Sequence, residues 1–223
     1  MARMREARFK KCRRLGLNVC GHLKAMKREG NGQARDHRKK LSPYGAQLLE
    51  KQRLRGYYEV MEKQFRKYVK AAMKGGVAFG DATTGEILVR MLETRLDNIV
   101  YRLNFASSIR QARQMVAHGH ILVNGHRVDR PSYSVGVGEV ISLKEKSKKN
   151  EGFKDAFANT PNFLPYLTKN IDALTGSMER HIPAREPVSV QALSREKYPG
   201  AKSNPARKAV QEMKYSSMQE CGI

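Results

Sequence analysis

RLDNIVYR, the sequence at residues 95–102, decides the fold of this chain. Leu96, Ile99 and Val100 recur within it at helical spacing, which predicts a helix with one apolar face. The arginine, aspartate and asparagine side chains between them fall off that face and are expected to point outward. A second segment, RQARQ at residues 110–114, follows after a turn. We therefore expect two short helices, each with a buried apolar side and an exposed polar side.

A small antiparallel sheet is predicted directly after the second helix. Asn124-Gly125 is the strongest two-residue hairpin signal available, because the tight hairpin turn requires positive φ at both positions. Short apolar runs on either side of it, and again further along, are typical of strands. The expected strands cover residues 121–123, 127–129, 135–137 and 140–143. The two helices and this sheet form one compact α+β unit.

Upstream of this unit the sequence predicts two further helices. Ser42 is a good N-cap and Pro43 suits the first helical position, so a helix starts there. Six apolar residues then recur at steps of three and four as far as Gly75, which predicts a single helix over this stretch. They are Leu54, Tyr58, Met61, Phe65, Tyr68 and Ala72. Thr83 and Glu86 have the spacing of a capping box and start the next helix.

The balance of charge points to a polyanionic partner. The chain of 223 residues has 43 Lys and Arg against 21 Asp and Glu, a net charge of +22. Phosphates that pair with Lys or Arg release counterions, so nucleic acid is the commonest partner of such a chain. A membrane is the rival partner, but no apolar run approaches the ~18 residues of a spanning helix. We expect no membrane contact and a soluble, unexported protein.

More than half of the surplus charge lies in the first quarter of the chain. Residues 1–55 contain 17 Lys and Arg against four Asp and Glu. The stretch at 3–14 is basic and has few periodic apolar residues, so we expect it to become ordered only on a polyanion. After residue 149 Pro, Ser, Asn and Gly are frequent, and extended or irregular chain is expected. The odd set of three cysteines favours a reducing cytosol.

These features divide an α+β protein into four parts. The expected parts are a basic N-terminal arm at 1–41, a helical domain at 42–92, the module of two helices and a small sheet at 93–149, and an extended tail at 150–223. The domain boundaries follow the changes in charge and in apolar periodicity. The module is the part with the clearest candidate function.

The polar side of the module is the candidate functional surface, because its core uses the apolar residues. Arg binds phosphate through two parallel hydrogen bonds, so a row of Arg and amide side chains is typical of proteins that position an RNA by its backbone. A single exposed Arg is usually just solvated, but a row favours binding. The candidate RNA-binding residues are Arg95, Asn98, Arg102, Arg110, Arg113, Gln114, His118, His120 and Asn124. The candidates for base stacking are Tyr44, Tyr57 and Tyr101.

The sequences at the helices and the hairpin resemble a known RNA-binding module. RLDNIVYR at 95–102, RQARQ at 110–114 and VNG at 123–125 are similar to the module that small-subunit ribosomal protein S4 shares with several RNA-modifying enzymes. The flanking sequences LSPYG at 41–45 and EKQFRKY at 62–68 resemble the N-terminal helical part of that ribosomal protein in its bacterial form. The flanks therefore favour the ribosomal protein family over the enzymes.

The resemblance covers roughly residues 1–190, including the order of the parts. It implies direct binding to small-subunit ribosomal RNA early in assembly, contact with a neighbouring ribosomal protein of the S5 family, an influence on decoding accuracy, and a place in the cytoplasmic ribosome. It implies that Arg38, Lys39 and Lys40 line the path by which messenger RNA reaches the subunit. By the same resemblance, further RNA contacts come from Arg8, Lys10, Lys11, Arg13, Arg14, Lys51, Gln52, Arg53 and Arg55.

Two departures from the family pattern concern zinc and the tail. Some relatives bind zinc through four N-terminal cysteines, whereas this chain has only Cys12 and Cys20 there. A structural zinc site needs four ligands, so we expect no zinc and no other cofactor. From residue 191 onward the tail is atypical, because the closing apolar strand of the family is missing.

An RNA-modifying enzyme is the main alternative. A pseudouridine synthase with this module needs a large additional catalytic domain, and the 74 aperiodic residues after Lys149 do not supply one. No Ser, His and acid set has the context of a catalytic site. His118, His120 and His126 flank a turn without acidic or cysteine neighbours, so ordinary surface or RNA-contacting histidines are favoured there over metal binding. We predict a structural RNA-binding protein of the small ribosomal subunit, not an enzyme.

Overall fold

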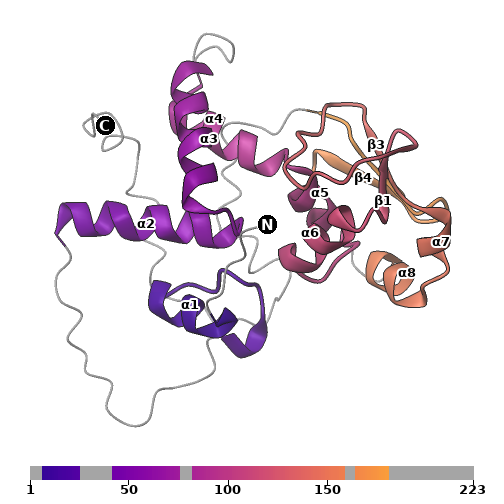
Figure 1. Ribbon diagram of the computed structural model, residues 1–223, viewed down its shortest axis with the longest axis horizontal. Helices are drawn as coiled ribbons and strands as arrows, with labels where there is room; N and C mark the ends of the chain where they lie inside the picture. The colour runs from indigo at the N-terminus through magenta and orange to yellow at the C-terminus, as the bar shows by residue number, and fades with distance from the viewer. Residues whose placement is uncertain (1–6, 26–41, 76–81, 159–163, 181–223) are drawn as a thin grey trace.

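The computed structural model describes residues 7–25, 42–75, 82–158 and 164–180 (Figure 1). The helices in this part are α1 (Arg8–Leu15), the short 3-10 helix η1 (Leu23–Ala25), α2 (Pro43–Tyr57), α3 (Glu62–Lys74), α4 (Thr84–Glu93), α5 (Leu96–Arg102), α6 (Ile109–Ala117), α7 (Glu145–Lys148) and α8 (Glu151–Ala158). The strands are β1 (Ile121–Val123), β2 (His126–Arg127), β3 (Val140–Leu143), β4 (Leu167–Asn170) and β5 (Thr175–Met178). None of these described helices is long and apolar enough to cross a membrane.

The N-terminal segment folds onto α2. Cys12 and Leu15 of α1 and Ala25 of η1 are buried in one cluster, and Leu49 of α2 packs against it. The prediction that the stretch at 3–14 becomes ordered only on a polyanion is therefore wrong for its helical part. Few apolar residues are needed, because they share one side of α1 and α2 covers that side.

The stretch predicted as one helix forms two helices, α2 and α3. Ser42 caps α2 as expected, because its Oγ accepts a hydrogen bond at 3.1 Å from the backbone N–H three residues on. The prediction of a single helix is wrong, since the chain leaves the helical path after Tyr57 and Glu59 has a φ of 51°. Tyr57, Tyr58 and Val60 are all buried. Such closely spaced buried side chains do not fit on one stripe of a continuous helix.

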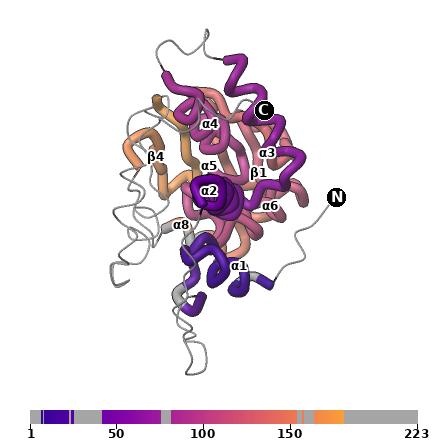
Figure 2. Tube along the Cα trace, turned by 90° about the vertical axis from the view of Figure 1, so that its left-hand side faces the viewer, coloured from indigo at the N-terminus to yellow at the C-terminus, as the bar shows by residue number. Residues whose placement is uncertain are grey.

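Helix α4 starts and packs as the sequence predicts. Glu86 N donates to Thr83 Oγ1, and Thr83 N donates to the Glu86 carboxylate at 2.8 Å, which completes a capping box. Ile87, Leu88 and Leu92 are buried in a cluster shared with α3. Figures 1 and 2 show α3 and α4 side by side on one side of α2, with α1 on the other side.

Helices α5 and α6 pack against a five-stranded antiparallel sheet with the strand order β2-β1-β3-β5-β4. Leu96 and Ile99 of α5 and Val116 of α6 share a core with Ile121 and Ile141 of the sheet. This arrangement confirms the predicted α+β class and the two short helices of the module.

The hairpin at the start of the sheet has the predicted geometry. Asn124 and Gly125 have φ values of 49° and 81°, the left-handed values of a type I′ turn. Val123 pairs with His126 across it. The returning strand β2 has two residues and ends earlier than predicted.

The prediction of a strand at 135–137 is wrong. In its place a single bridge joins Ser134 to Arg95. The N–H of Val135 donates to the Thr94 carbonyl at 2.8 Å, so this segment bonds to the start of α5. The backbone of the segment at 134–135 therefore holds the start of α5 in place.

The chain after residue 149 completes the sheet. Strand β5 pairs with β3, and β4 pairs with β5. The prediction of extended or irregular chain is therefore wrong for 151–158, which form α8, and at 167–178 it missed that the extended segments pair into the sheet. These strands are short and Gly176 interrupts the apolar alternation, so the sequence pattern alone is too weak to predict them. The remaining tail at 181–223, with its atypical end, lies outside the described residues.

Gly176→Ala is expected to destabilise the fold by about 1–3 kcal/mol. A Cβ at this position would lie 2.5 Å from Leu103 Cδ2, and Leu103 is fully buried, so the leucine has no free space to move into. Urea unfolding followed by circular dichroism measures the change. Gly152→Ala, at the exposed start of α8, is the matched control and should be neutral or slightly stabilising. Equal stability of both variants would contradict the place of β5 in the sheet.

Lys169 is expected to titrate close to neutral pH. Its Nζ donates to the Phe157 carbonyl at 3.3 Å and lies 4.7 Å from the centroid of that ring. Burial lowers its pKa from 10.5 to about 8. Since the unfolded chain keeps this proton to higher pH, the free energy of unfolding should rise between about pH 8 and 10.5. NMR titration of the lysine ε-methylene groups, with Lys169→Gln as the assignment control, measures the midpoint. A midpoint at the ordinary lysine value would contradict this environment.

Candidate nucleic-acid interface

Three of the predicted contact residues on α5 and at its start are buried. Arg95, Asn98 and Arg102 have exposed fractions of 3%, 1% and 7%. The prediction that they face outward is wrong, because buried Glu93 and Asp97 pair with the two arginines. A buried charge is tolerated when an opposite charge and hydrogen bonds compensate it. These side chains hold the fold together and are removed from the candidate RNA surface.

The carboxylate of Glu93 is the centre of the first buried network. Its Oε1 accepts hydrogen bonds from Arg102 at 2.7 Å and from Tyr58 OH at 2.5 Å. Its Oε2 accepts one from Asn98 Nδ2 at 2.6 Å. Burial alone would lower the pKa of Arg102, but Glu93 outweighs it and the pKa lies well above the ordinary value. Arg102 therefore keeps its charge beside Glu93, and the pair connects the break between α2 and α3 to α5.

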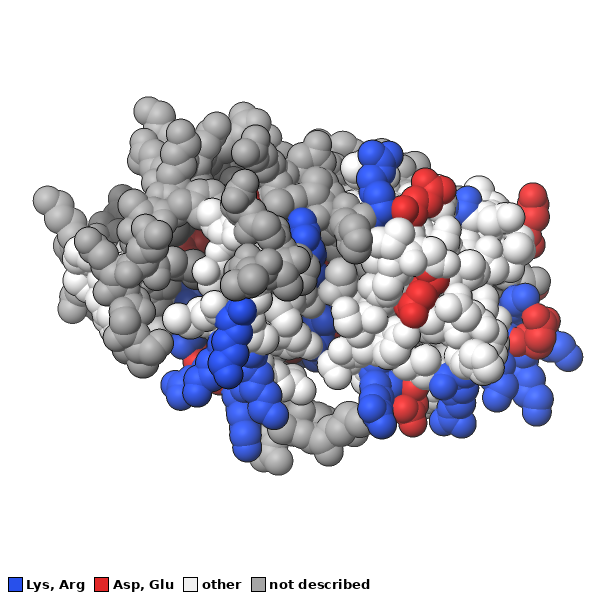
Figure 3. Space-filling view, turned by 90° about the horizontal axis from the view of Figure 1, so that it is seen from above, with Lys and Arg blue, Asp and Glu red and all other residues white. Residues whose placement is uncertain are grey.

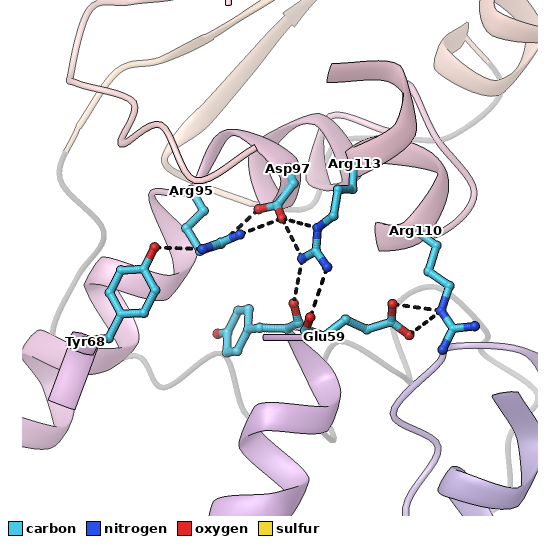
Figure 4. A network of polar contacts seen from close by, with 7 residues as sticks. Glu59, Tyr68, Arg95, Asp97, Arg110 and Arg113 are labelled. Carbon is cyan, nitrogen blue, oxygen red and sulfur yellow. Dashed lines mark hydrogen bonds and ion pairs between the residues drawn. The ribbon is translucent and has the colours of Figure 1, made fainter. Parts of the chain in front are cut away.

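Asp97 is the centre of the second buried network (Figure 4). It accepts two hydrogen bonds from Arg95, at 3.0 and 2.8 Å, and one from Arg113 Nη2 at 2.7 Å. Arg95 also donates to Tyr68 OH at 2.7 Å. Burial opposes the charge of Arg95, yet the bonds to Asp97 raise its pKa above the ordinary value. This network connects α3, α5 and α6.

Arg110 and Arg113 join α6 to the break between α2 and α3. Arg113 donates to the backbone carbonyls of Glu59 and Tyr58 at 3.0 and 3.3 Å. Arg110 donates to the Glu59 carboxylate at 2.8 Å, and this bond raises its pKa. The two side chains are 40% and 31% exposed, respectively. Figure 4 shows that both side chains reach toward Glu59, and the exposed fractions show that each is only partly open to the surface.

The charged basic residues predicted on α2 form ion pairs with acidic residues of the same chain. Glu62 pairs with Lys51 at 2.6 Å and with Arg55 at 2.5 Å. The hydrogen bond from Lys51 and that from Arg55 lower the pKa of Glu62. Arg53 pairs with Glu50 and also donates to the last carbonyl of α1 at 2.9 Å. These side chains hold α1, α2 and α3 together, and their surface is only partly open.

The basic residues of α1 fall into an exposed set and one buried residue. The exposed set is Lys10, Arg13 and Arg14. Lys11 is 7% exposed, so its prediction as a surface contact is wrong. Its stem packs against Gly56 of α2, which has no side chain in the way. Arg8 is the first residue of α1, and the predicted messenger contacts at 38–40 lie outside the described residues.

The predicted stacking residues occupy three different environments. Tyr44 is 70% exposed on α2, and Tyr101 is half-buried. Tyr57 is 7% exposed and packs edge-on against Tyr58, so its prediction as a stacking residue is wrong. Gln52, on the same helix as Tyr44, is half-buried. Tyr44 alone of the three rings offers an open face.

The residues at the end of α6 and at the hairpin are mostly exposed. Gln114 and His118 face the surface. His120 Nδ1 is 2.9 Å from a serine hydroxyl of α7, and the ring is half-buried. Asn124 is exposed, but its Oδ1 accepts a hydrogen bond from the first N–H of β3 at 2.8 Å. His120 and Asn124 therefore have structural roles beside any RNA contact.

Cys12 and Cys20 lie next to each other on the α1 side of the molecule. Their sulfur atoms are 3.2 Å apart, and Asn18 Oδ1 is 3.5 Å from Cys20 Sγ. The hydrogen bond to Cys20 and burial raise the pKa of the Cys12 thiol, which opposes the thiolate form that binds metals. Within the described ranges no group of three or more His, Cys, Asp or Glu residues could hold a metal ion. The absence of a cofactor stays a prediction.

Helix α3 carries exposed basic residues that were not among the predicted contacts. Lys63, Lys67, Lys70 and Lys74 are exposed along this helix. Their spacing of four, three and four residues was an available signal, because it places them on one side of a helix. The prediction for this segment rests only on the apolar stripe on the opposite side of α3, which indicates a core contact.

Two family models match the two halves of this architecture. The S4 domain matches residues 94–141, and the Ribosomal protein S4/S9 N-terminal domain matches residues 3–93. A small ribosomal subunit protein uS4 from Finegoldia magna is 59% identical over 170 residues, which cover 76% of this chain and 84% of that relative. The chain belongs to the uS4 family. Its relatives also include uS4B of Clostridium acetobutylicum, 48% identical over 180 residues, covering 81% of this chain and 88% of the relative.

Membership in the uS4 family confirms the resemblance that the sequence indicates. It also places the chain among structural, non-enzymatic proteins, so the alternative of an RNA-modifying enzyme is set aside. A uS4A protein of Alkaliphilus oremlandii is 43% identical over 206 residues, which cover 86% of this chain and 94% of the relative. The S4 domain match ends within β3, so β4 and β5 extend the uS4 sheet beyond the matched residues.

Glu93→Gln is expected to destabilise this uS4 protein by about 3–5 kcal/mol, because it leaves Arg102 buried without its counter-ion. The loss is measured as a lower urea midpoint at an unchanged m-value. Glu145→Gln removes a surface ion pair with Lys148 and is the matched control, with an expected loss of about 0–1 kcal/mol. Similar losses in the two variants would mean that the Glu93 network does not hold the fold.

Proposed function

We propose that this uS4-family protein is a structural constituent of the small ribosomal subunit that binds its ribosomal RNA directly. The names of its relatives and the match to the S4 domain support the ribosome and its RNA as partners. In this proposal the protein performs no chemistry. It holds RNA segments in position through contacts to their phosphates.

The observation that carries the proposal is the division of the basic residues into two sets. Those between the helical part and the module are neutralised by Glu93, Asp97 and Glu59. Lys10 and Arg13 on α1 are exposed, and no described residue pairs with their side chains. In a chain of net charge +22, such unneutralised residues favour an external polyanion.

The neutralised set supports the same function in a different way. Glu59, Asp97 and Glu93 connect the helical part to the module through ion pairs and hydrogen bonds. Helix α1 lies on one side of α2, and α3 lies on the other (Figures 1 and 2). A preorganised frame reduces the entropy lost on binding, so exposed charges on it bind RNA more tightly than charges on a loose chain.

The RNA contacts that we propose combine exposed basic, amide and aromatic side chains. Within the described residues they are Lys10, Arg13, Arg14, Tyr44, Gln52, Gln114 and His118, with the outer edges of Arg110 and Arg113. Arg8 joins them by its place at the start of α1. Lys51, Arg53 and Arg55 contribute positive potential while they stay paired with Glu62 and Glu50.

Finer parts of the function rest on the family resemblance. We propose that the protein binds ribosomal RNA early in subunit assembly in the cytoplasm, contacts a neighbouring protein of the S5 family and influences decoding accuracy. We also propose that Arg38, Lys39 and Lys40 contact messenger RNA. Charge at these three positions suits such a contact, because it binds phosphate without reading sequence.

The direct test is chemical probing of small-subunit ribosomal RNA with the purified full-length protein over a series of salt concentrations. Protection of one discrete multi-helix junction is expected, and it should survive moderate salt. An unrelated structured RNA is the control and should show no discrete protection. Uniform protection of both RNAs that salt removes would overturn specific ribosomal RNA binding.

Lys10→Gln is expected to lower the slope of log affinity against log salt concentration by about one, the effect of one lost phosphate contact. Lys11→Gln is the matched control, because Lys11 is the next residue of the same helix but is buried. This control should leave the slope unchanged. Equal slopes for both variants would contradict the contact at the exposed side of α1.

A further inference from the structure

Helix α3 carries a lysine stripe, Lys63, Lys67, Lys70 and Lys74, that lies outside the contacts proposed for RNA. The four residues follow one another at steps of four, three and four, so they share one side of the helix. All four are exposed. The opposite side of α3 is fixed in the core by Phe65, which is 3% exposed. The stripe therefore has a defined direction and cannot turn inward.

No described residue neutralises the lysine stripe. None of its four side chains has an ion pair or hydrogen bond to the described part of the chain. Glu62, the acidic residue of the helix, already pairs with three other basic side chains. Lysines three and four residues apart repel one another, and Lys63 lies in the first turn, where the helix dipole disfavours a cation. A polyanion along the stripe would relieve both effects.

The shape of the stripe suits an extended line of phosphates. From Lys63 to Lys74 it is about 16 Å long, with one ammonium group per turn of the helix. Figure 3, which views the molecule from above, shows Lys and Arg side chains gathered densely over the part that contains α3. The exposed apolar side chain of Met73, which is 58% exposed, lies about a quarter turn away from the stripe on the same helix. A protein partner would use apolar anchors at the centre of its contact, and these are missing from the stripe.

We propose that the lysine stripe of α3 binds the phosphodiester backbone of a ribosomal RNA segment separate from the one bound at α1. The two helices lie on opposite sides of α2 (Figures 1 and 2). Lysine acts as a point charge, so this contact positions RNA without reading its bases. The proposal rests on the proposed function and adds a second RNA-binding face to it. The protein thus joins two RNA segments across the helical part of its fold.

The test compares two variants of the full-length protein on small-subunit ribosomal RNA. One variant changes all four lysines of the stripe to Gln, and the matched control changes them to Arg. The Gln variant should lower the salt slope by about three, as expected for the loss of four phosphate contacts. It should lose protection of one continuous RNA segment and keep the protection that depends on Lys10. The Arg variant should retain both the slope and the protection.

Each remaining outcome decides against one specific claim. An unchanged slope and footprint in the Gln variant would overturn the stripe proposal, while discrete protection by the wild type would leave the proposed function in place. No discrete protection by the wild type would overturn the proposed function instead. The melting temperature of the Gln variant should equal or exceed that of the wild type. A lower value would show that the four lysines stabilise the unbound protein, and it would overturn the proposal. Normal RNA binding with weaker incorporation into subunits would indicate an acidic protein partner and also overturn the proposal.

Discussion

The ion pair between Glu93 and Arg102 is buried where the helical part of the chain meets the module. Glu93 is fully buried and Arg102 is almost fully buried, so each charge depends on the other for its compensation. Tyr58 and Asn98 supply further hydrogen bonds to the carboxylate. An apolar pair of similar volume could provide as much stability. The distinctive contribution of the ion pair is therefore geometric, because directed bonds from Arg102, Tyr58 and Asn98 fix the position of α5 relative to the break between α2 and α3.

The conformation of that break depends on the same constraint. Glu59 has a positive φ, which is unfavourable for a residue with a side chain. In this conformation its carbonyl faces Arg113 and its carboxylate faces Arg110. Asp97 holds Arg113 from the other side. The local strain is thus compensated by contacts from residues more than 50 positions further along the chain, and the helical part and the module are held as one frame.

Local signals in the sequence were sufficient for the parts of the fold that depend on neighbouring residues. The caps at Ser42 and Thr83 follow from side chains that bond three positions along the chain, and the hairpin follows from the positive φ that Asn124 and Gly125 adopt. The buried arginines could not be predicted in this way. Periodicity assigns a side chain to the surface when it is polar, whereas the burial of Arg102 depends on Glu93 nine positions earlier and on tyrosines from distant segments. The last two strands were missed because an existing sheet edge, formed by β3, specifies them more strongly than their own short pattern does.

The different chemistry of arginine and lysine explains which basic residues lie inside. The guanidinium group of Arg95 or Arg102 binds both oxygens of a carboxylate or several acceptors at once, so it fits a buried network with little loss of hydrogen bonding. An ammonium group is more strongly hydrated and remains at the surface unless a partner is fixed beside it. Arg95 and Arg102 of the module are therefore buried and Arg110 and Arg113 are partly exposed, while the lysines of α3 are exposed. In the proposed function, RNA binding relies on where the exposed charges are held, and the buried arginines fix the helices that carry them.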